Sequence, residues 1–240
     1  MTRDRGHRTG RGKRAVGRGL TRRVKTAKGR TPSSTRWLQR QLNDVYVREA
    51  ERQGLRSRAA FKLMELDDRF HFLAPGKRVV DLGAAPGGWT LVAVQRVKAD
   101  KGRGRVIALD ANPMEPVAGA TVLCRDFLDA ATPAALRAAL DGPADVVLSD
   151  MAMPATGHAG TDHLRITALC EAALAFATEV LAPGGVFVAK MLKGGTEHAV
   201  LADLKRLFTR VRHAKPPASR AESAETYVIA RGFRGKGRGD

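Results

Sequence analysis

Residues 79–89 read Val-Val-Asp-Leu-Gly-Ala-Ala-Pro-Gly-Gly-Trp, and this stretch decides the fold class. The apolar run that ends at Leu82 predicts a buried strand, and the small residues after it predict a tight turn into a helix. A strand, a glycine-containing turn and a helix in this order are typical of an α/β sheet that binds a ligand at the carboxyl ends of its strands. Pro86 lacks the amide donor that a pyrophosphate would need, so the turn favours a nucleoside without phosphates over a dinucleotide.

Two acidic residues follow the next two predicted strands. Asp110 closes the first, where its carboxylate can accept hydrogen bonds from both hydroxyls of an adenosine ribose, and Asp126 follows the second, within reach of an adenine edge. Taken singly, each could be a helix cap or a turn residue. In this order they favour S-adenosylmethionine over NAD as the cofactor, with Gly83, Gly87 and Trp89 of the turn as further cofactor-binding residues.

Helical and strand periodicities alternate from about Trp37 onward, which predicts an α/β fold. Ser57 is interpreted as the N-cap of a helix that runs to Phe70, and two more helices are predicted at 162–181 and 197–208. Seven strands are predicted, at 78–82, 105–110, 121–123, 144–149, 185–189, 211–214 and 226–230.

The link between the last two predicted strands fixes the topology of that end of the sheet. It is only about ten residues long and contains Pro216 and Pro217, which is too short and too broken for the helical crossover of a parallel pair. The last strand is therefore expected to be antiparallel. It would begin at the edge where the parallel strands end, which is also the edge where open α/β sheets bind ligands.

The charge of the chain points to a polyanionic partner. The net charge is +18, and residues 1–40 contain fourteen Lys or Arg and one acidic residue, so this segment carries +13 of it. Its glycines and its lack of large apolar residues predict a disordered arm that binds RNA. An inert solubilising tail and a targeting segment are the other two interpretations. The expected organisation is this arm at 1–40, a catalytic domain at 41–233 and a basic tail at 234–240.

Several other classes of protein do not fit the sequence. The most apolar stretch, at 168–182, is interrupted by Glu171 and Glu179, so we expect no membrane span and a cytoplasmic protein. Cys124 and Cys170 are far apart, and the histidines lack the spacing of zinc ligands, so we expect no metal site.

Four stretches of the chain resemble a known family. Residues 56–63, 81–89, 148–152 and 223–227 are similar, in this order, to motifs of the FtsJ/RrmJ-like ribosomal RNA 2′-O-ribose methyltransferases. The resemblance extends from about Asp44 to Phe233. It implies a Rossmann-like class I methyltransferase sheet, S-adenosylmethionine as cofactor, and methylation of a uridine ribose in large-subunit ribosomal RNA. It also implies ribosomal RNA, within the large subunit or its precursor, as the partner of a monomeric enzyme.

The resemblance implies a catalytic tetrad of Lys62, Asp150, Lys190 and Glu225. Asp150 and Lys190 follow predicted parallel strands and Glu225 precedes the antiparallel one, so these three should meet at one edge of the sheet, with Asp150 also facing the cofactor. Lys190 is assigned to the reacting hydroxyl, as a base if neutral or as a stabiliser of the developing oxyanion if charged. Two ordinary ion pairs on a basic protein are the competing interpretation.

Two loops depart from the family pattern, and both flank the substrate. The family often has Met-Ala-Pro-Asn after the tetrad aspartate, where this chain has Met-Ala-Met-Pro at 151–154, and the usual Lys-Val-Phe-Gln-Gly is Lys-Met-Leu-Lys-Gly at 190–194. The identity of the target nucleotide therefore stays open. The alternatives are a 2′-O-methyltransferase of transfer RNA or of an mRNA cap, and a non-catalytic ribosome-assembly protein that binds RNA.

Overall fold

The computed structural model describes residues 29, 31–154, 156–193 and 198–235, and the chain divides into two compact units, Met1–Asp44 and Val45–Asp240. Within the first unit the helix α1 (Pro32–Asn43) begins after Thr31, whose side chain accepts a hydrogen bond from the backbone N–H of Ser34 at 3.2 Å. The expectation of disorder is therefore wrong for residues 32–40, where a capping residue precedes a glycine-free segment. The preceding part of the predicted arm lies outside the described residues.

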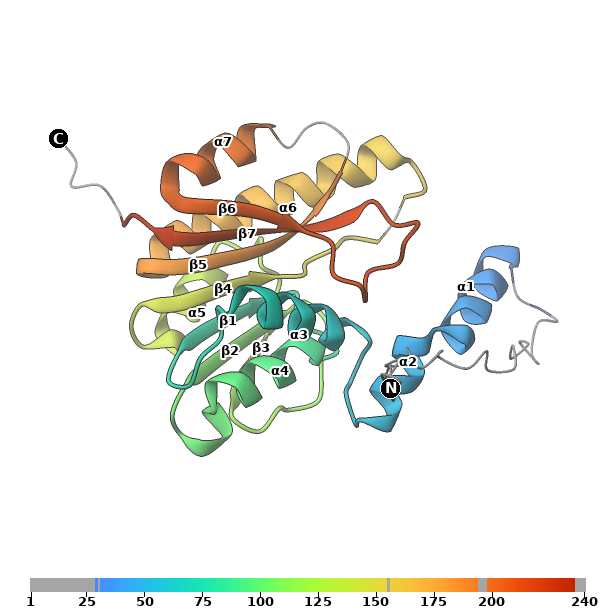
Figure 1. The fold of residues 1–240 in the computed structure, drawn as a ribbon, viewed down its shortest axis with the longest axis horizontal. Helices are drawn as coiled ribbons and strands as arrows, with labels where there is room; N and C mark the ends of the chain where they lie inside the picture. The colour runs from blue at the N-terminus through green and yellow to red at the C-terminus, as the bar shows by residue number, and fades with distance from the viewer. Residues whose placement is uncertain (1–28, 30, 155, 194–197, 236–240) are drawn as a thin grey trace, which may run out of the picture. The chain divides into compact units, whose positions relative to one another are not determined.

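The second unit is built on a seven-stranded sheet with the order β3-β2-β1-β4-β5-β7-β6 (Figure 1). The strands β1 to β5 pair in parallel, and β7 is antiparallel to both of its neighbours. This confirms the predicted fold class and the antiparallel last strand. The strands are β1 (Arg78–Leu82), β2 (Arg105–Asp110), β3 (Ala120–Cys124), β4 (Ala144–Ser149), β5 (Leu181–Leu192), β6 (Phe208–Ala214) and β7 (Glu225–Phe233).

Helices cover the two faces of this sheet (Figure 1). One core lies between the sheet and α3 and α4, and the other lies between the sheet and α5, α6 and α7. The neighbours Val79 and Val80 of β1 belong to opposite cores, because successive strand residues point to opposite faces. The helices of this unit are α2 (Val45–Arg52), α3 (Ala59–Phe70), α4 (Gly88–Val97), η1 (Ala99–Lys101), α5 (Thr132–Leu140), α6 (Ala159–Val180) and α7 (His198–Leu207).

Several local predictions differ from the structure; the strand predicted at 211–214, for example, begins at Phe208. Ser57 is not a side-chain cap: α3 begins after Arg58, and the Ser57 hydroxyl is buried without a hydrogen-bond partner within the described residues. The strand predicted to stop at Ala189 continues to Leu192, because it pairs with β7 as far as Glu225. The antiparallel ladder thus extends the strand by three residues, and it places Lys190 inside a strand.

A buried carboxylate fixes the turn that joins α3 to the sheet. Asp67 is only 2% exposed, and its Oδ1 accepts hydrogen bonds from the backbone N–H groups of Phe72 at 3.0 Å and Leu73 at 2.8 Å. The chain leaves α3 through His71, which has a left-handed φ of 50°. Asp67 therefore satisfies two donors that the end of the helix would otherwise leave buried and unpaired.

Replacing Asp67 with Ala should lower the free energy of unfolding by about 2–4 kcal/mol, because two buried N–H groups lose their acceptor. The matched control is Asp68→Ala on the same helix, since Asp68 is exposed and pairs with the same Arg96. That change should cost less than about 1 kcal/mol. Urea unfolding of the two variants measures the difference, and equal effects would contradict the assignment.

Candidate active site at the carboxyl edge of the sheet

A cavity of about 470 Å³ opens at the carboxyl ends of the parallel strands. Its lining includes Gly83 after β1, Asp110 at the end of β2, Asp126 after β3 and Asp150 after β4. Pockets of this size accommodate drug-sized ligands and nucleosides. The edge where the sequence predicted a cofactor thus has a cavity lined by the predicted acidic residues.

The Gly83 turn brings two backbone segments into close approach beside this cavity. Gly83 has a φ of +77°, and a Cβ at this position would lie 2.7 Å from the Cα of Met151. Only glycine is compatible with both features. Beyond the turn, Asp110 accepts a hydrogen bond from the N–H of Ala85 at 2.9 Å through Oδ2 and one from the N–H of Asn112 at 2.8 Å through Oδ1. These bonds hold the carboxylate at the rim of the cavity.

The other two predicted cofactor residues do not line the cavity. Gly87 is the N-cap of α4, with a φ of +102°. Trp89 is 2% exposed, donates its Nε1–H to the carbonyl oxygen of Ala59 at 2.8 Å, and packs 5.6 Å from the Tyr227 ring. Within the described chain, neither residue forms part of the cavity surface. Gly87 and Trp89 instead belong to the start of α4, which lies beside the cavity.

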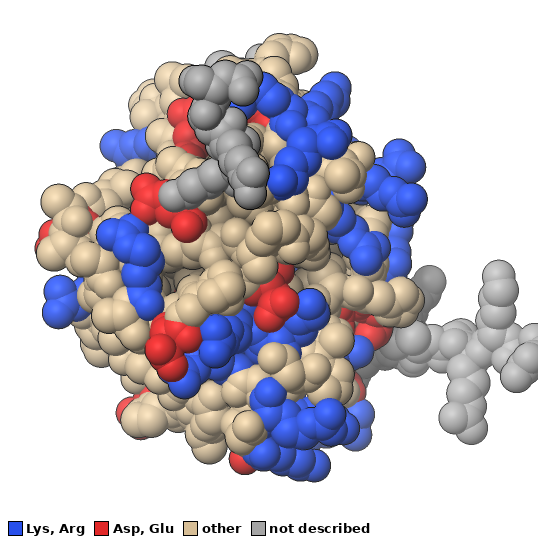
Figure 2. Space-filling view, turned by 90° about the vertical axis from the view of Figure 1, so that its left-hand side faces the viewer, with Lys and Arg blue, Asp and Glu red and all other residues tan. Residues whose placement is uncertain are grey.

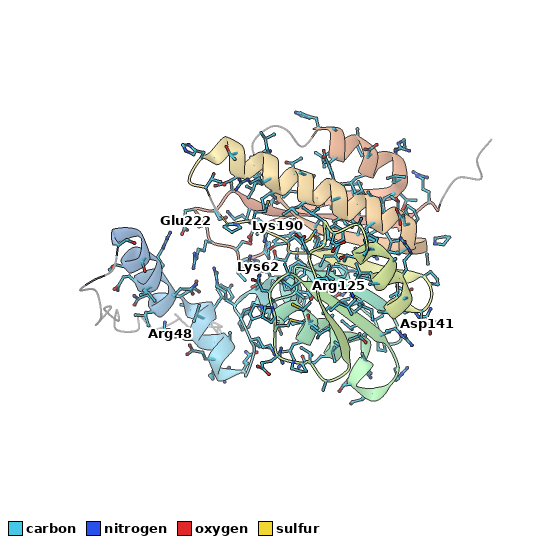
Figure 3. All side chains as sticks on the ribbon, turned by 180° about the vertical axis from the view of Figure 1, so that it is seen from behind. Arg48, Lys62, Arg125, Asp141, Lys190 and Glu222 are labelled. Atoms are coloured by element: carbon cyan, nitrogen blue, oxygen red, sulfur yellow. The ribbon has the colours of Figure 1, made fainter. Side chains whose placement is uncertain are left out.

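The four residues of the predicted tetrad form two ion pairs. Lys190 Nζ lies 2.7 Å from Asp150 Oδ1, and Lys62 Nζ lies 2.7 Å from Glu225 Oε1. All four side chains are at most 16% exposed. Figure 3 shows Lys62 of α3 and Lys190 of β5 approaching the same end of the sheet. Lys62 is adjacent to Glu225 although 163 positions separate them in the sequence.

The hydroxyl of Tyr227 joins the two pairs. It donates a hydrogen bond to Asp150 Oδ1 at 2.7 Å and accepts one from Lys62 Nζ at 3.2 Å. Burial, together with the charges of Asp150 and Glu225, raises the pKa of Tyr227 well above its ordinary value, so the hydroxyl keeps its proton. Burial alone would raise the pKa of Asp150, but the charges of Lys190 and Lys62 outweigh it and the pKa lies below its ordinary value.

A second cavity of about 230 Å³ lies on the other side of the segment 152–154. Its lining includes Lys190 and Glu225 of the ion pairs, together with Asp162, Arg165 and Ser223. The first cavity is lined by Asp150, whose carboxylate contacts Lys190. A group bound in the first cavity and a group bound in the second would therefore meet at the Asp150–Lys190 pair.

Most of the sequence, and the fold, match known methyltransferases. Residues 55–233 match the model of the FtsJ-like methyltransferase family. The chain belongs to this family. It is 63% identical over 232 residues to the ribosomal RNA large subunit methyltransferase E of Paramagnetospirillum magneticum, covering 96% of this chain and 95% of the relative. The corresponding protein of Rhodospirillum rubrum is 62% identical over 224 residues, covering 93% and 85%.

A solved structure agrees with this assignment. A protein from Plasmodium falciparum that is described as a ribosomal RNA methyltransferase superposes with a TM-score of 0.67 at 28% identity, covering 75% of this chain and 100% of that chain. Family membership confirms the enzyme class and the S-adenosylmethionine cofactor that the resemblance and the loop residues predicted. Within the described residues no helix is both long and apolar enough to cross a membrane.

Three further residues shape the site of this FtsJ-like methyltransferase, and none of them was assigned a role from the sequence. Tyr227 could have been found, because strand alternation places it on the same face of β7 as Glu225. Ser219 donates a hydrogen bond to Glu225 Oε1 at 2.8 Å from an irregular loop, which carries no periodic signal. Arg56 donates hydrogen bonds to the backbone carbonyls of Glu115 and Pro116 and so ties the approach to α3 to the loop after β2.

Asp81 lies at the base of the cofactor turn and is fully buried. Burial raises its pKa to about 7, and the charges of Asp150 and Asp110 add to this effect, while a hydrogen bond from Thr90 at 2.7 Å opposes it. A folded-state pKa above the unfolded value means that ionisation opposes folding. The stability contribution of Asp81 is therefore complete below about pH 4 and falls as the pH rises toward 7.

Asp81→Asn should remove this pH dependence. The stability of the variant relative to the parent should rise between pH 5 and pH 7 by about 2–3 kcal/mol, at about 1.4 kcal/mol for each pH unit, and stay level above pH 8. Urea unfolding of both proteins across this range measures the difference. A difference that is the same at every pH would show that Asp81 is ionised in the folded state throughout.

Proposed function

We propose that this chain transfers the methyl group of S-adenosylmethionine to a ribose 2′-hydroxyl of large-subunit ribosomal RNA, with uridine as the target. The observation that carries the proposal is the joining of two lysine–carboxylate pairs through Tyr227 between two adjacent cavities. The curated relatives, which are ribosomal RNA large subunit methyltransferases, support the choice of RNA. The proposal extends to a monomer in the cytoplasm that acts on the large ribosomal subunit or its precursor.

Within this proposal the first cavity holds the cofactor, which supplies an electrophilic methyl group. Asp110, Asp126 and Asp150 line this cavity. Asp110 would accept hydrogen bonds from the ribose hydroxyls, Asp126 would contact the adenine edge, and Asp150 would face the positive sulfur. Gly83 supports this fit because it lines the cavity without a side chain. Gly87 and Trp89 contribute indirectly, by starting α4 and by supporting the Tyr227 ring.

The second cavity receives the target nucleotide, with its 2′-hydroxyl at Lys190. Lys190 takes up the hydroxyl proton or, as an ammonium group, stabilises the negative charge that develops on the oxygen. Asp150 orients Lys190 through the 2.7 Å ion pair, and Glu225 holds Lys62 in the same way. Positioning is a large part of the rate enhancement, because an oxygen held in line with the methyl group reacts without a further loss of entropy.

Lys190→Met should lower single-turnover methylation by about a hundredfold or more, the scale expected for loss of a proton acceptor or an electrostatic stabiliser. Affinity for S-adenosylmethionine should change little, because Lys190 does not line the first cavity. Lys205→Met is the control and should keep the parent activity, since Lys205 is an exposed lysine of α7 that lines neither of the described cavities. Full activity of Lys190→Met would contradict a catalytic role, and Lys190 would then be a member of a structural ion pair.

The reaction itself is tested by mapping 2′-O-methyl groups across total ribosomal RNA and transfer RNA from cells with and without this protein. One large-subunit uridine should lose its methyl group in the deletion strain and regain it with the parent chain but not with Lys190→Met. A lost methyl group in transfer RNA instead would favour the alternative substrate. An unchanged methylation map would favour a non-catalytic role in ribosome assembly.

We also propose that the basic N-terminal segment binds RNA phosphates without sequence preference. Residues 1–30 contain twelve Lys or Arg, and contacts from such side chains release counterions from RNA. Deleting residues 2–30 should flatten the dependence of RNA affinity on salt, by about 0.7 in the log–log slope for each lost single-strand contact. Cofactor affinity should stay the same. An unchanged slope together with altered location in cells would support the targeting interpretation.

A further inference from the structure

Three exposed arginines lie together on the two strands at one side of the sheet. Arg210 of β6 is paired directly with Arg231 of β7, and Arg212 lies two residues further along β6. Directly opposed residues of an antiparallel pair point to the same face, with their Cβ atoms about 5 Å apart, and so do residues i and i+2 of one strand. These three side chains, the β6–β7 arginine cluster, therefore project from one face.

This is the face of α3 and α4, and α3 reaches β7 at the end that carries Tyr227. Tyr227 and Ile229 alternate with Arg231 along β7 and belong to the core beneath α3 and α4. The contacts of α4 with the sheet are made to β1 and β2. Figure 2 views the ends of the strands that lie away from the first cavity, and Lys and Arg side chains gather at its upper right.

The arrangement is unfavourable for the fold alone. Like charges directly opposite each other in an antiparallel pair destabilise it. Some exposed arginines of this unit have acidic partners: Arg137 lies 2.6 Å from Glu179, and Arg206 lies 2.9 Å from Asp203. Within the described part of the chain, no ion pair is found for any member of the β6–β7 arginine cluster. Among the residues that the structure describes, the three guanidinium groups lack acidic partners, and the opposed pair lowers the stability of the fold. This indicates that they bind an anion from outside the chain.

The cluster is also placed to act on the proposed reaction. Ala214 of β6 pairs with Tyr227, which contacts the Lys62 and Asp150 side chains. Strand geometry puts Arg212 about 7 Å and Arg210 about 14 Å along β6 from that pair. The cluster thus extends away from the catalytic edge along an open face, where a nucleic acid strand leaving the second cavity could follow it.

We infer that Arg210, Arg212 and Arg231 bind the phosphate backbone of the RNA that flanks the target nucleotide. The inference rests on the proposed function, because it takes the RNA substrate as the occupant. Guanidinium groups suit phosphate well, since their planar donors can make two parallel hydrogen bonds to it. The contacts fix the position of the RNA and carry no base specificity.

The test uses the full-length chain and large-subunit ribosomal RNA transcribed in vitro. The double variant Arg210→Thr/Arg231→Thr should weaken the Kd at about 0.15 M salt by about tenfold or more and reduce the log–log salt slope by about two. The control Lys101→Thr/Arg103→Thr removes the same charge from the exposed turn before β2 and should leave both quantities nearly unchanged. Affinity for S-adenosylmethionine and the rate at saturating RNA should be those of the parent in both variants.

A second readout separates RNA binding from a structural role. The melting temperature of the Arg210→Thr/Arg231→Thr variant should rise by about 1–3 °C at low salt, because the like-charge pair is removed. Weaker RNA binding by a more stable protein would support the inference. If the control variant loses as much RNA affinity as Arg210→Thr/Arg231→Thr, the inference is overturned, because the loss then reflects the net charge of the chain and not these arginines. If the double variant binds RNA as the parent does but aggregates, the inference is overturned, because the arginines then protect the edge strand β6 from pairing with other chains. If its binding is weaker only to assembled ribosomal particles, the inference is overturned as well, because the arginines then contact a protein.

This test can be read independently of the reaction. If the parent chain forms no 2′-O-methyl nucleotide, the proposed function fails, while the comparison of RNA affinities still stands. If methylation is found but the double variant binds RNA as the parent does, only the role of the β6–β7 arginine cluster fails.

Discussion

The hydroxyl of Tyr227 is the contact on which the site depends, because it joins two ion pairs that would be costly to bury separately. It bridges Lys62 and Asp150, while Glu225 and Lys190 complete the pairs. Burying a charge without a partner costs several kcal/mol. The elements α3, β4, β5 and β7, which supply these groups, are therefore held in a single arrangement. Removing one member leaves another buried charge uncompensated.

This arrangement also connects the two cavities. Asp150 lines the cavity at the ends of β1 to β4, and Lys190 lines the cavity beyond the segment 152–154. In the proposed function this ion pair would link the bound cofactor to the bound acceptor. A methyltransferase gains most from holding these two reactants in line, and a preorganised pair does so without reorganising during the reaction.

The positive charges of β6 and β7 lower the stability of the fold but would favour the binding of RNA. Arg210 and Arg231 oppose each other across β6 and β7, whereas Arg137 and Arg206 have acidic neighbours. Residues that break a local rule of stability tend to lie at functional sites. Together with the basic N-terminal segment, the β6–β7 arginine cluster would spread phosphate contacts over a long stretch of RNA, while the tetrad acts on one nucleotide.

The sequence alone determined the mixed sheet and the edge at which Asp110, Asp126 and Asp150 line one cavity. The bounds of β1, β2 and β4 were predicted correctly because these strands are buried on both faces and read as continuous apolar runs. Asp110, Asp126 and Asp150 could be placed because parallel strands end at one edge. Only the tertiary structure decided that Lys190 lies inside β5, that Trp89 packs into the core and that Tyr227 bridges the pairs. These features depend on contacts between residues that are far apart in the sequence. Local periodicity indicates whether a side chain is buried and on which face of its helix or strand it lies, but it does not indicate which distant residue the side chain contacts.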